Sequence, residues 1–314
     1  MKLETSSKVL QLKKRFKSIK WALLLMVLPG ALLTLILSYV PMYGIQVAFK
    51  EINYNNTIWN APWVGLKNFE FLFKTPDAWI ITRNTIAYNL VFIVVGMVLN
   101  ISCAILLSEL MSKKLSKLYQ NVIFMPYLFS MVIVAYLVFA LLSADYGWIN
   151  THILAKFGID KINWYTETSK WPVILCLVYF WKSVGYGSIL YIASLAGIDT
   201  ALFEAATIDG ANRWQKARYV TIPSLSPVIV ISLIRGIGGM FRSDFGLFFN
   251  VPMDNSALYP VTNTLDTFSY RALLVSGDTG MAAAVTFYQS LVGLILILLA
   301  NYAVKKIDPD KAFF

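Results

Sequence analysis

The chain has 314 residues, of which 58% are hydrophobic, and its mean hydropathy is +0.63. Soluble domains usually contain about 45–50% apolar residues, and the excess here lies in runs long enough to cross a bilayer, so a soluble domain is excluded. The net charge of +10 would suit nucleic acid. However, the basic residues cluster beside the apolar runs, so we expect a membrane and no nucleic acid as their partner.

The N-terminal region combines a basic arm, residues 1–20, with an apolar run at about 21–40. An arm followed by an apolar run is also typical of a signal peptide. This run is long, however, and no cleavage site of small residues follows it. We therefore predict a first span that is retained in the mature protein.

Five more apolar runs predict spans at about 80–108, 121–142, 171–196, 223–241 and 281–304. Pro223 and Pro227 fall in the first turns of the fifth span, where proline is tolerated. The sequence thus predicts an all-α integral membrane protein with six transmembrane helices in one domain, residues 21–304, and a tail at 305–314. The segment 242–280 is the longest predicted external connection.

The distribution of basic residues predicts the orientation, because positive residues near span ends favour the cytoplasmic side. The arm, the 109–120 loop, the 197–222 loop and the tail are all basic, and a six-span topology places all four on one side. We therefore expect both termini and the 197–222 loop to be cytoplasmic. The basic residues are Lys2, Lys8, Lys13, Lys14, Arg15, Lys17, Lys20, Lys113, Lys114, Lys117, Arg213, Lys216, Arg218, Lys305, Lys306 and Lys311.

The 197–222 loop contains a polar stretch that is too long for a tight turn. Ala205 and Ala206 favour a helix, and Glu204 suits a first helical turn, where the helix dipole favours a negative charge. Gly210 permits a sharp bend after this helix. We predict a short helix with an alanine-lined face that is shaped to press into a cleft on another protein.

This stretch resembles the EAA loop of importer permeases of the ATP-binding-cassette (ABC) class. That pattern is Glu-Ala-Ala, three residues, Gly, nine residues and Ile-x-Leu-Pro. The Glu-Ala-Ala, the Gly spacing and Pro223 fit, whereas Val220 and Ile222 replace Ile and Leu. Residues 180–227 as a whole resemble permeases of carbohydrate importers fed by a solute-binding protein, and most of all the branch for oligosaccharides and polysaccharide fragments.

The resemblance implies a type I ABC importer permease fold and an assembly of several subunits in the bacterial cytoplasmic membrane. The expected partners are a second homologous permease, two cytoplasmic ATPases that bind ATP and Mg, and an external, lipid-anchored binding protein. This chain would be a transporter subunit without a cofactor and not an enzyme. Glu204 would either pair with a basic group of the ATPase or cap neighbouring amides. The positions that match the coupling loop are Glu204, Ala205, Ala206, Asp209, Gly210 and Ala211.

Polar residues inside the predicted spans are candidates for the transport path, because ionisable groups in a membrane are costly and usually functional. Lys182 lies roughly 16 Å into the fourth span. Tyr179 and Tyr186 share its helix face. Arg235 lies in the fifth span and Asn89 in the second. Each of these residues would either contact a sugar or make a structural bond between helices.

The sequence leaves open whether Lys182 and Arg235 bind an anionic saccharide or pair with a carboxylate of a second, different permease. We predict a polar or anionic oligosaccharide as the cargo. Gly185 and Gly187 are expected to allow close helix packing and not to contact a ligand.

Three other functions are open to the chain. These alternatives are an importer permease for another solute, a secondary transporter and a membrane-embedded enzyme. Secondary transporters often have two related halves with broken helices, which the sequence does not show. No P-loop motif or plausible nucleophile is present. The only histidine is His152, and the cysteines Cys103 and Cys176 lie in predicted spans, so neither a metal site nor a disulfide framework is expected.

Overall fold

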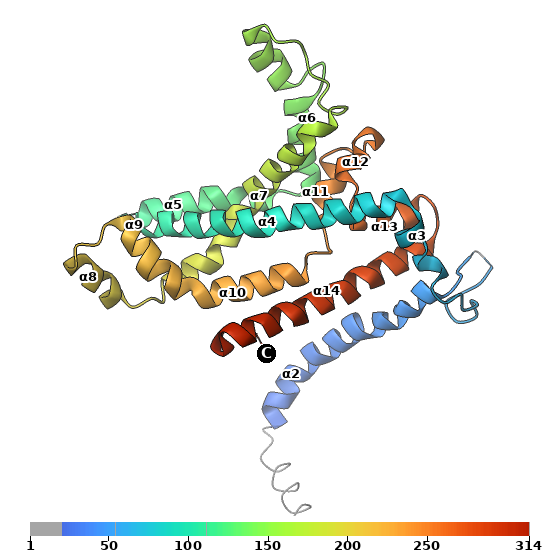
Figure 1. Cartoon of the computed structure of the whole chain (residues 1–314), viewed down its shortest axis with the longest axis horizontal. Coiled ribbons are helices and arrows are strands. Elements are labelled where there is room, and N and C mark those ends of the chain that lie inside the picture. The colour runs from blue at the N-terminus through green and yellow to red at the C-terminus, as the bar shows by residue number, and fades with distance from the viewer. Residues whose placement is uncertain (1–20, 54, 111, 314) are drawn as a thin grey trace, which may run out of the picture.

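The computed structural model describes residues 21–53, 55–110 and 112–313, so the predicted basic arm lies outside the described residues. In this part, five helical stretches are long and apolar enough to cross a membrane, and a bent pair of helices makes a sixth, in agreement with the six predicted spans. Helices α4 (Pro76–Ser108), α10 (Ile222–Gly238) and α14 (Thr279–Ile307) lie side by side, and α7 (Trp171–Leu195) crosses α4 (Figure 1).

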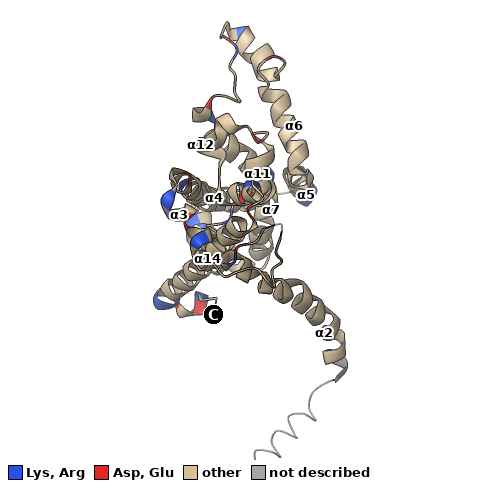
Figure 2. Cartoon of the chain, turned by 90° about the vertical axis from the view of Figure 1, so that its right-hand side faces the viewer, with Lys and Arg blue, Asp and Glu red and all other residues tan. Residues whose placement is uncertain are grey.

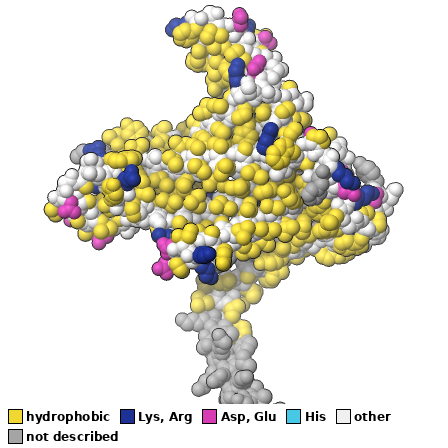
Figure 3. Space-filling model, viewed as in Figure 1, with side chains coloured by type: hydrophobic (Ala, Val, Ile, Leu, Met, Phe, Trp, Pro, Cys, Tyr) yellow, Lys and Arg dark blue, Asp and Glu magenta, His cyan; other side chains and the backbone are white. Residues whose placement is uncertain are grey.

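The main core lies where α4 and α7 cross. Tyr88 and Phe92 of α4 and Trp171 and Leu175 of α7 are buried there, together with Phe248 of α11 (Phe245–Asn250). Charged side chains gather mostly towards the ends of the molecule, whereas hydrophobic side chains cover the surface between them (Figures 2 and 3). This is the surface pattern of a helix bundle that sits in a bilayer.

The first span is longer than predicted and stands apart from the bundle. Helix α2 (Trp21–Thr34) continues through a π-helical turn, η1 (Leu35–Tyr39), into the 3₁₀ segment η2 (Val40–Phe49). Only the end of this stretch packs on α14, where Phe49 meets Phe287 with ring centroids 5.3 Å apart. The apolar surface of α2 is therefore free for lipid or for another subunit (Figure 1).

The span predicted at 121–142 is not one helix. It begins earlier, with α5 (Lys113–Phe124) and the 3₁₀ turn η4 (Met125–Leu128), and it continues as α6 (Met131–Leu142) after a bend of 94°. Phe129 and Ser130 have extended backbones at the bend. The Ser130 hydroxyl accepts a hydrogen bond from the Ile133 N–H (3.4 Å), so it caps a new helix.

The fifth span also extends beyond its predicted start. Pro223 lies in the first turn of α10, as predicted, and Pro227 lies in the second turn. The helical backbone continues before them through a π-helical turn, η8 (Ala217–Thr221), into α9 (Arg213–Lys216). A π-helical turn is one way to fit proline into a longer helix, because it shifts the hydrogen-bond pattern that proline interrupts.

The segment 242–280 was expected to be an external connection, and for its beginning this expectation is wrong. The Asn89 amide donates to the Arg242 carbonyl and the Gln289 amide donates to the Phe241 carbonyl, both at 2.8 Å. The backbone at 241–244 therefore lies beside the interiors of α4 and α14. The side chains of Leu247, Phe248, Val251 and Leu258 then enter the main core.

The remaining elements are short. They are η3 (Lys67–Phe69), α3 (Phe71–Lys74), η5 (Ile149–Leu154), η6 (Ala155–Phe157), η7 (Thr168–Lys170), α8 (Thr200–Ile208), η9 (Ser256–Leu258), α12 (Tyr259–Thr262), α13 (Leu265–Leu274) and η10 (Pro309–Lys311). Among them, α8 lies at one end of the bundle, beyond the ends of α4 and α7 (Figure 1).

Candidate coupling helix and transport path

The predicted short helix is α8, but it begins four residues earlier than expected. The Asp199 carboxylate accepts a hydrogen bond from the Ala201 N–H (2.9 Å) and caps the helix, which starts at Thr200. Glu204 therefore lies in the second turn, and the expectation that it occupies the first turn is wrong. Its side chain is exposed and makes no hydrogen bond or ion pair within the described residues.

The predicted bend at Gly210 is present. Gly210 has a φ of +77°, the left-handed conformation that residues with a side chain rarely adopt. The Ala211 N–H donates to the Ala206 carbonyl (2.9 Å) and the Gly210 N–H donates to the Thr207 carbonyl (3.1 Å). These two bonds form a Schellman motif, which satisfies carbonyls at the end of α8 and turns the chain sharply.

The chain after the bend is tied back to α8. Asn212 and Gln215 form a reciprocal capping box at the start of α9. The Lys216 ammonium group donates to the Thr207 hydroxyl at 2.7 Å. Helix α8 is therefore held in a fixed direction relative to the span that follows it.

The outer surface of the segment from α8 to α9 exposes several apolar side chains, although this segment is a connecting loop. Ile208 is 87% exposed, Trp214 is 71% exposed, and Leu202 and Ala205 are exposed as well. Glu204 adds a negative charge among them. An exposed apolar patch rimmed by charge is typical of a protein interaction site.

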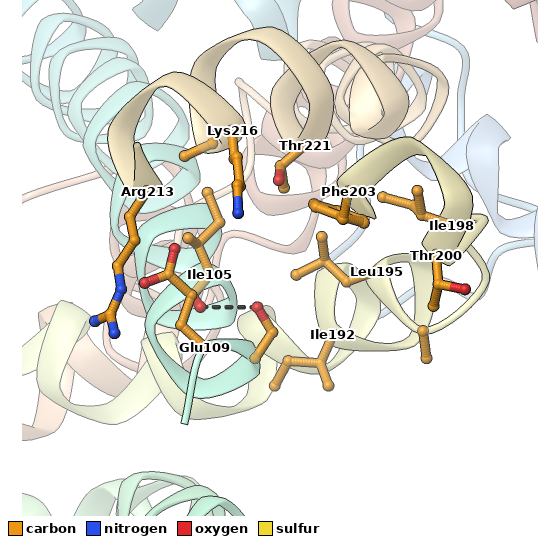
Figure 4. A pocket seen from close by; sticks show the side chains of 13 residues that line it. Ile105, Glu109, Ile192, Leu195, Ile198, Thr200, Phe203, Arg213, Lys216 and Thr221 are labelled. Carbon is orange, nitrogen blue, oxygen red and sulfur yellow. Dashed lines mark hydrogen bonds between the residues drawn. The ribbon is translucent and has the colours of Figure 1, made fainter. Parts of the chain in front are cut away.

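Behind α8 lies a cleft of about 610 Å³ between the ends of α4, α7 and α9. Phe203 and Lys216 point into this cleft, and Glu109 lies beside Arg213 at its edge (Figure 4). Space behind α8 means that this helix is joined to the bundle mainly through its two ends.

Lys182, a predicted path residue, is bound within the chain. Its ammonium group donates to the backbone carbonyls of Phe129 (2.5 Å), Tyr127 (2.9 Å) and Pro126 (3.5 Å). The ammonium group also lies 5.4 Å from the ring centroid of Tyr127. A cation suits this place, because carbonyls at a helix C-terminus are unpaired and carry partial negative charge. Lys182 therefore stabilises the bend between η4 and α6.

Gly185 allows this contact. A Cβ atom at Gly185 would lie 2.1 Å from the Ile123 carbonyl oxygen, so α5 and α7 pack backbone to backbone. At Gly187, a Cβ atom would lie 2.5 Å from the amide nitrogen of Asn100. Both distances confirm the prediction that these glycines serve close helix packing.

The other predicted path residues fall into different environments. Tyr179 stacks on Phe92 in the main core, with ring centroids 3.7 Å apart. The Asn89 side-chain amide donates hydrogen bonds to the backbone carbonyls of Thr85 and Arg242. Tyr186 is 53% exposed and stacks on the exposed ring of Tyr127 at 4.2 Å.

Arg235 differs from all of these residues. It lies on α10 with its side chain exposed, and within the described residues its guanidinium group has no hydrogen-bond or ion-pair partner. It is thus a cation in a candidate span with no carboxylate partner among residues 21–53, 55–110 and 112–313.

Sequence reasoning missed one polar cluster in the bundle. One oxygen of the Asp266 carboxylate accepts hydrogen bonds from the Ser243 N–H (2.5 Å), the Ser243 hydroxyl (2.8 Å) and the Gln289 amide (3.0 Å). Asp266 had been assigned to an external loop. The available signal was Gln289, a buried amide side chain in an otherwise apolar run that needs a polar partner.

Comparisons with known proteins identify the family. A family described as "Binding-protein-dependent transport system inner membrane component" matches residues 96–309. The chain belongs to this family. The "Polygalacturonan/rhamnogalacturonan transport system permease protein YteP" of Bacillus subtilis (strain 168) is 34% identical over 288 residues, which cover 92% of this chain and 89% of that protein. "Protein LplB" of the same organism is 31% identical over 309 residues, 98% of this chain and 96% of that protein.

Solved structures agree with this assignment. A chain of a bacterial ABC transporter "involved in the import of the acidic polysaccharide alginate" superimposes with a TM-score of 0.84 at 30% identity, over 95% of this chain and 99% of that chain. The same comparison with the alginate transporter in complex with an alginate pentasaccharide-bound periplasmic protein gives a TM-score of 0.82 at 30% identity, over 93% and 97% of the two chains. The predicted type I importer permease fold is confirmed, and the chain is a membrane permease subunit of a binding-protein-dependent ABC importer and not an enzyme. The predicted likeness to permeases of carbohydrate importers is confirmed as well.

Proposed function

We propose that this permease imports oligosaccharides that carry uronic acid residues. One observation supports this cargo above the others. The chain is similar, over almost its whole length, to a relative named for polygalacturonan and rhamnogalacturonan and to a solved chain of an alginate transporter. The saccharides named for these two proteins all contain sugar carboxylates. The sugar carboxylate is thus the feature common to the named cargoes, and neutral oligosaccharides are the competing class.

The proposed assembly contains a second, different permease, two ATPases and a lipid-anchored binding protein in the bacterial cytoplasmic membrane. ATP and Mg bind to the ATPases, and this chain needs no cofactor of its own. The end of the bundle that carries α8 faces the cytoplasm together with both termini. Two observations support this side, namely the basic residues around α8 and the apolar patch formed by Leu202, Ile208 and Trp214.

Helix α8 is the proposed coupling helix of this subunit. Ala205 and Ala206 keep its surface small, so that it can approach an ATPase closely, while Glu204 is free to pair with a basic group there. Asp209, Gly210 and Ala211 form the turn that fixes the direction of α8. Movement of the ATPases would then be passed to α10 through α9 and η8, which are continuous with it.

The cargo is tested with the full complex, including its binding protein, in proteoliposomes. ATP-dependent uptake is measured for galacturonate or alginate oligomers and for the same oligomers after chemical reduction of their carboxyl groups to neutral sugars. We expect the acidic oligomers to be taken up much faster. Equal or better uptake of the neutral oligomers would refute the proposed cargo but would leave the permease assignment intact.

The coupling role is tested with Gly210→Val. Nothing lies within 4 Å of the added Cβ atom, so the main effect of the substitution is on the backbone conformation. A left-handed backbone with a side chain costs about 1–2 kcal/mol, which lowers the equilibrium constant for the native turn about tenfold. We expect uptake and substrate-stimulated ATP hydrolysis to fall by up to this factor, with normal membrane insertion. Gly197→Ala, in the same loop but with an ordinary contact of 3.5 Å, is the control. Normal coupling in Gly210→Val would contradict the proposal.

A further inference from the structure

The position of Arg235 carries one more inference about this permease. The next residue, Gly236, packs on Ile93, because a Cβ atom at Gly236 would lie 3.1 Å from the Ile93 side chain. Ile93 lies in the middle of the 33-residue helix α4. The turn that follows α10 is held by Asn89 and Gln289, which also lie inside their helices. Arg235, in the last turn of α10, therefore lies level with the middle of α4 and not with either end of that helix.

An exposed guanidinium group at this depth does not face lipid, because a charge in hydrocarbon is costly. It faces either another protein subunit or a water-filled path. The exposed side of α10 carries Pro223, Pro227, Ile231 and Arg235 at intervals of four residues, so these residues share one helix face. Arg235 is the single charge on this otherwise apolar face.

Neighbouring charges leave Arg235 available for a ligand. Lys182, the other cation deep in the bundle, is bound to three carbonyls. Arg242 reaches the Ser290 hydroxyl at 3.4 Å. Asp244 is the carboxylate nearest along the chain, and it caps α11 by accepting a hydrogen bond from the Leu247 N–H (3.1 Å). It forms no ion pair with Arg235 within the described residues.

Exposed aromatic rings of η4 and α7 are also suited to contact a sugar. The stacked pair Tyr127 and Tyr186 is exposed, 40% and 53%, and it is fixed in place because Lys182 holds the backbone of Tyr127. Helix α7, which carries Tyr186, packs on α10, which carries Arg235. Rings offer an apolar face to a pyranose, and a guanidinium group binds a carboxylate through two parallel hydrogen bonds.

We propose that Arg235 is the residue of the transport path that reads the carboxylate of an acidic oligosaccharide, and that Lys182 is a positioning residue. This inference rests on the proposed function, since it names the group that would select uronate-bearing cargo. Arginine suits the role better than lysine, because its planar fork matches a carboxylate and stays charged at every physiological pH. The competing account is an ion pair between Arg235 and a carboxylate of the second permease.

The test uses the full complex with its binding protein in proteoliposomes and the paired cargoes described above, acidic oligomers and their carboxyl-reduced forms. Arg235→Gln removes the charge, and Arg235→Lys keeps the charge without the fork. Arg83→Gln is the matched control, because it makes the same change of charge at an exposed arginine bonded to Asn84 and Pro260 elsewhere on the bundle.

For Arg235→Gln we expect uptake of the acidic oligomer to fall at least tenfold, uptake of the reduced oligomer to stay within twofold, and the subunits to copurify as before. Arg235→Lys should lie between native and Arg235→Gln. An equal loss for both cargoes, or loss of the second permease on purification, would overturn the inference in favour of an ion pair between subunits. Unchanged acidic uptake would also overturn it. If the native complex takes up only neutral oligomers, the proposed cargo itself fails, and this outcome is recognised before any variant is made.

Discussion

Replacing Lys182 by Met should destabilise the permease and reduce transport of every cargo equally. The substitution keeps most of the side-chain volume but leaves the carbonyls of Tyr127 and Phe129, now at 2.9 and 2.5 Å from the ammonium group, without their donor. Hydrogen bonds to a charged group contribute about 1.5–3 kcal/mol each. Because Lys182 is only half-buried and water can replace part of the loss, we expect a total of about 3 kcal/mol.

The measurement is the thermal unfolding temperature of the purified complex, which should fall by about 5 °C or more. It is accompanied by uptake of acidic and carboxyl-reduced oligomers. Lys305→Met, at an exposed lysine near the end of α14, is the control and should be close to native. Native stability with a selective loss of acidic uptake in Lys182→Met would refute our reasoning, because it would make Lys182 a sugar-binding residue.

Two further predictions concern stability. Gly185→Ala should lower the free energy of unfolding by about 1–3 kcal/mol or more, because its Cβ atom would collide with the Ile123 carbonyl oxygen at 2.1 Å. Gly96→Ala, whose Cβ atom has its nearest contact at 3.7 Å, should be tolerated. Equal unfolding temperatures for the two variants would contradict this packing. Burial raises the pKa of the Tyr165 hydroxyl to about 12, whereas its pKa in the unfolded chain is about 10. The contribution of the neutral hydroxyl to the free energy of unfolding is therefore fully present below about pH 10 and should be lost as the pH rises to about 12. Tyr165→Phe removes this dependence. The difference in stability between the native protein and Tyr165→Phe should therefore shrink between about pH 10 and about pH 12, and a constant difference would show that Tyr165 is not protected in the fold.

The sequence predicted continuous, strongly apolar helices well. The span predicted at 171–196 is α7, Trp171–Leu195, because a long apolar run leaves the backbone no alternative in a membrane. The break at Phe129 and Ser130 could not be predicted in the same way, since the apolar run continues through it. Its stability depends on Lys182, which comes from a distant part of the chain.

The candidate site shows the same division between local and distant causes. The turn at Gly210 was predictable because glycine is the residue that a left-handed backbone favours. The start of α8 was misplaced although Asp199 is a recognisable cap that precedes it directly. The sequence also treated Lys182 and Arg235 as equivalent cations. Only packing separates them, because backbone carbonyls at a bend bind Lys182, whereas Arg235 forms no hydrogen bond or ion pair within the described residues.

The central claim, that α8 transmits the action of an ATPase to this permease, is tested most directly by cross-linking. In a chain with Cys103 and Cys176 replaced by alanine, Ile208→Cys places a thiol on α8 at a position that is 87% exposed, and Trp59→Cys places one in the loop at the other end of the bundle. We predict that, with an added oxidant that accepts two electrons, the thiol at position 208 forms a disulfide with a cysteine introduced into the ATPase subunit. This disulfide stops ATP-driven uptake and is reversed by reductant, while the thiol at position 59 forms none. A cross-link to the ATPase from position 59, or uptake that continues unchanged with position 208 cross-linked, would contradict the account.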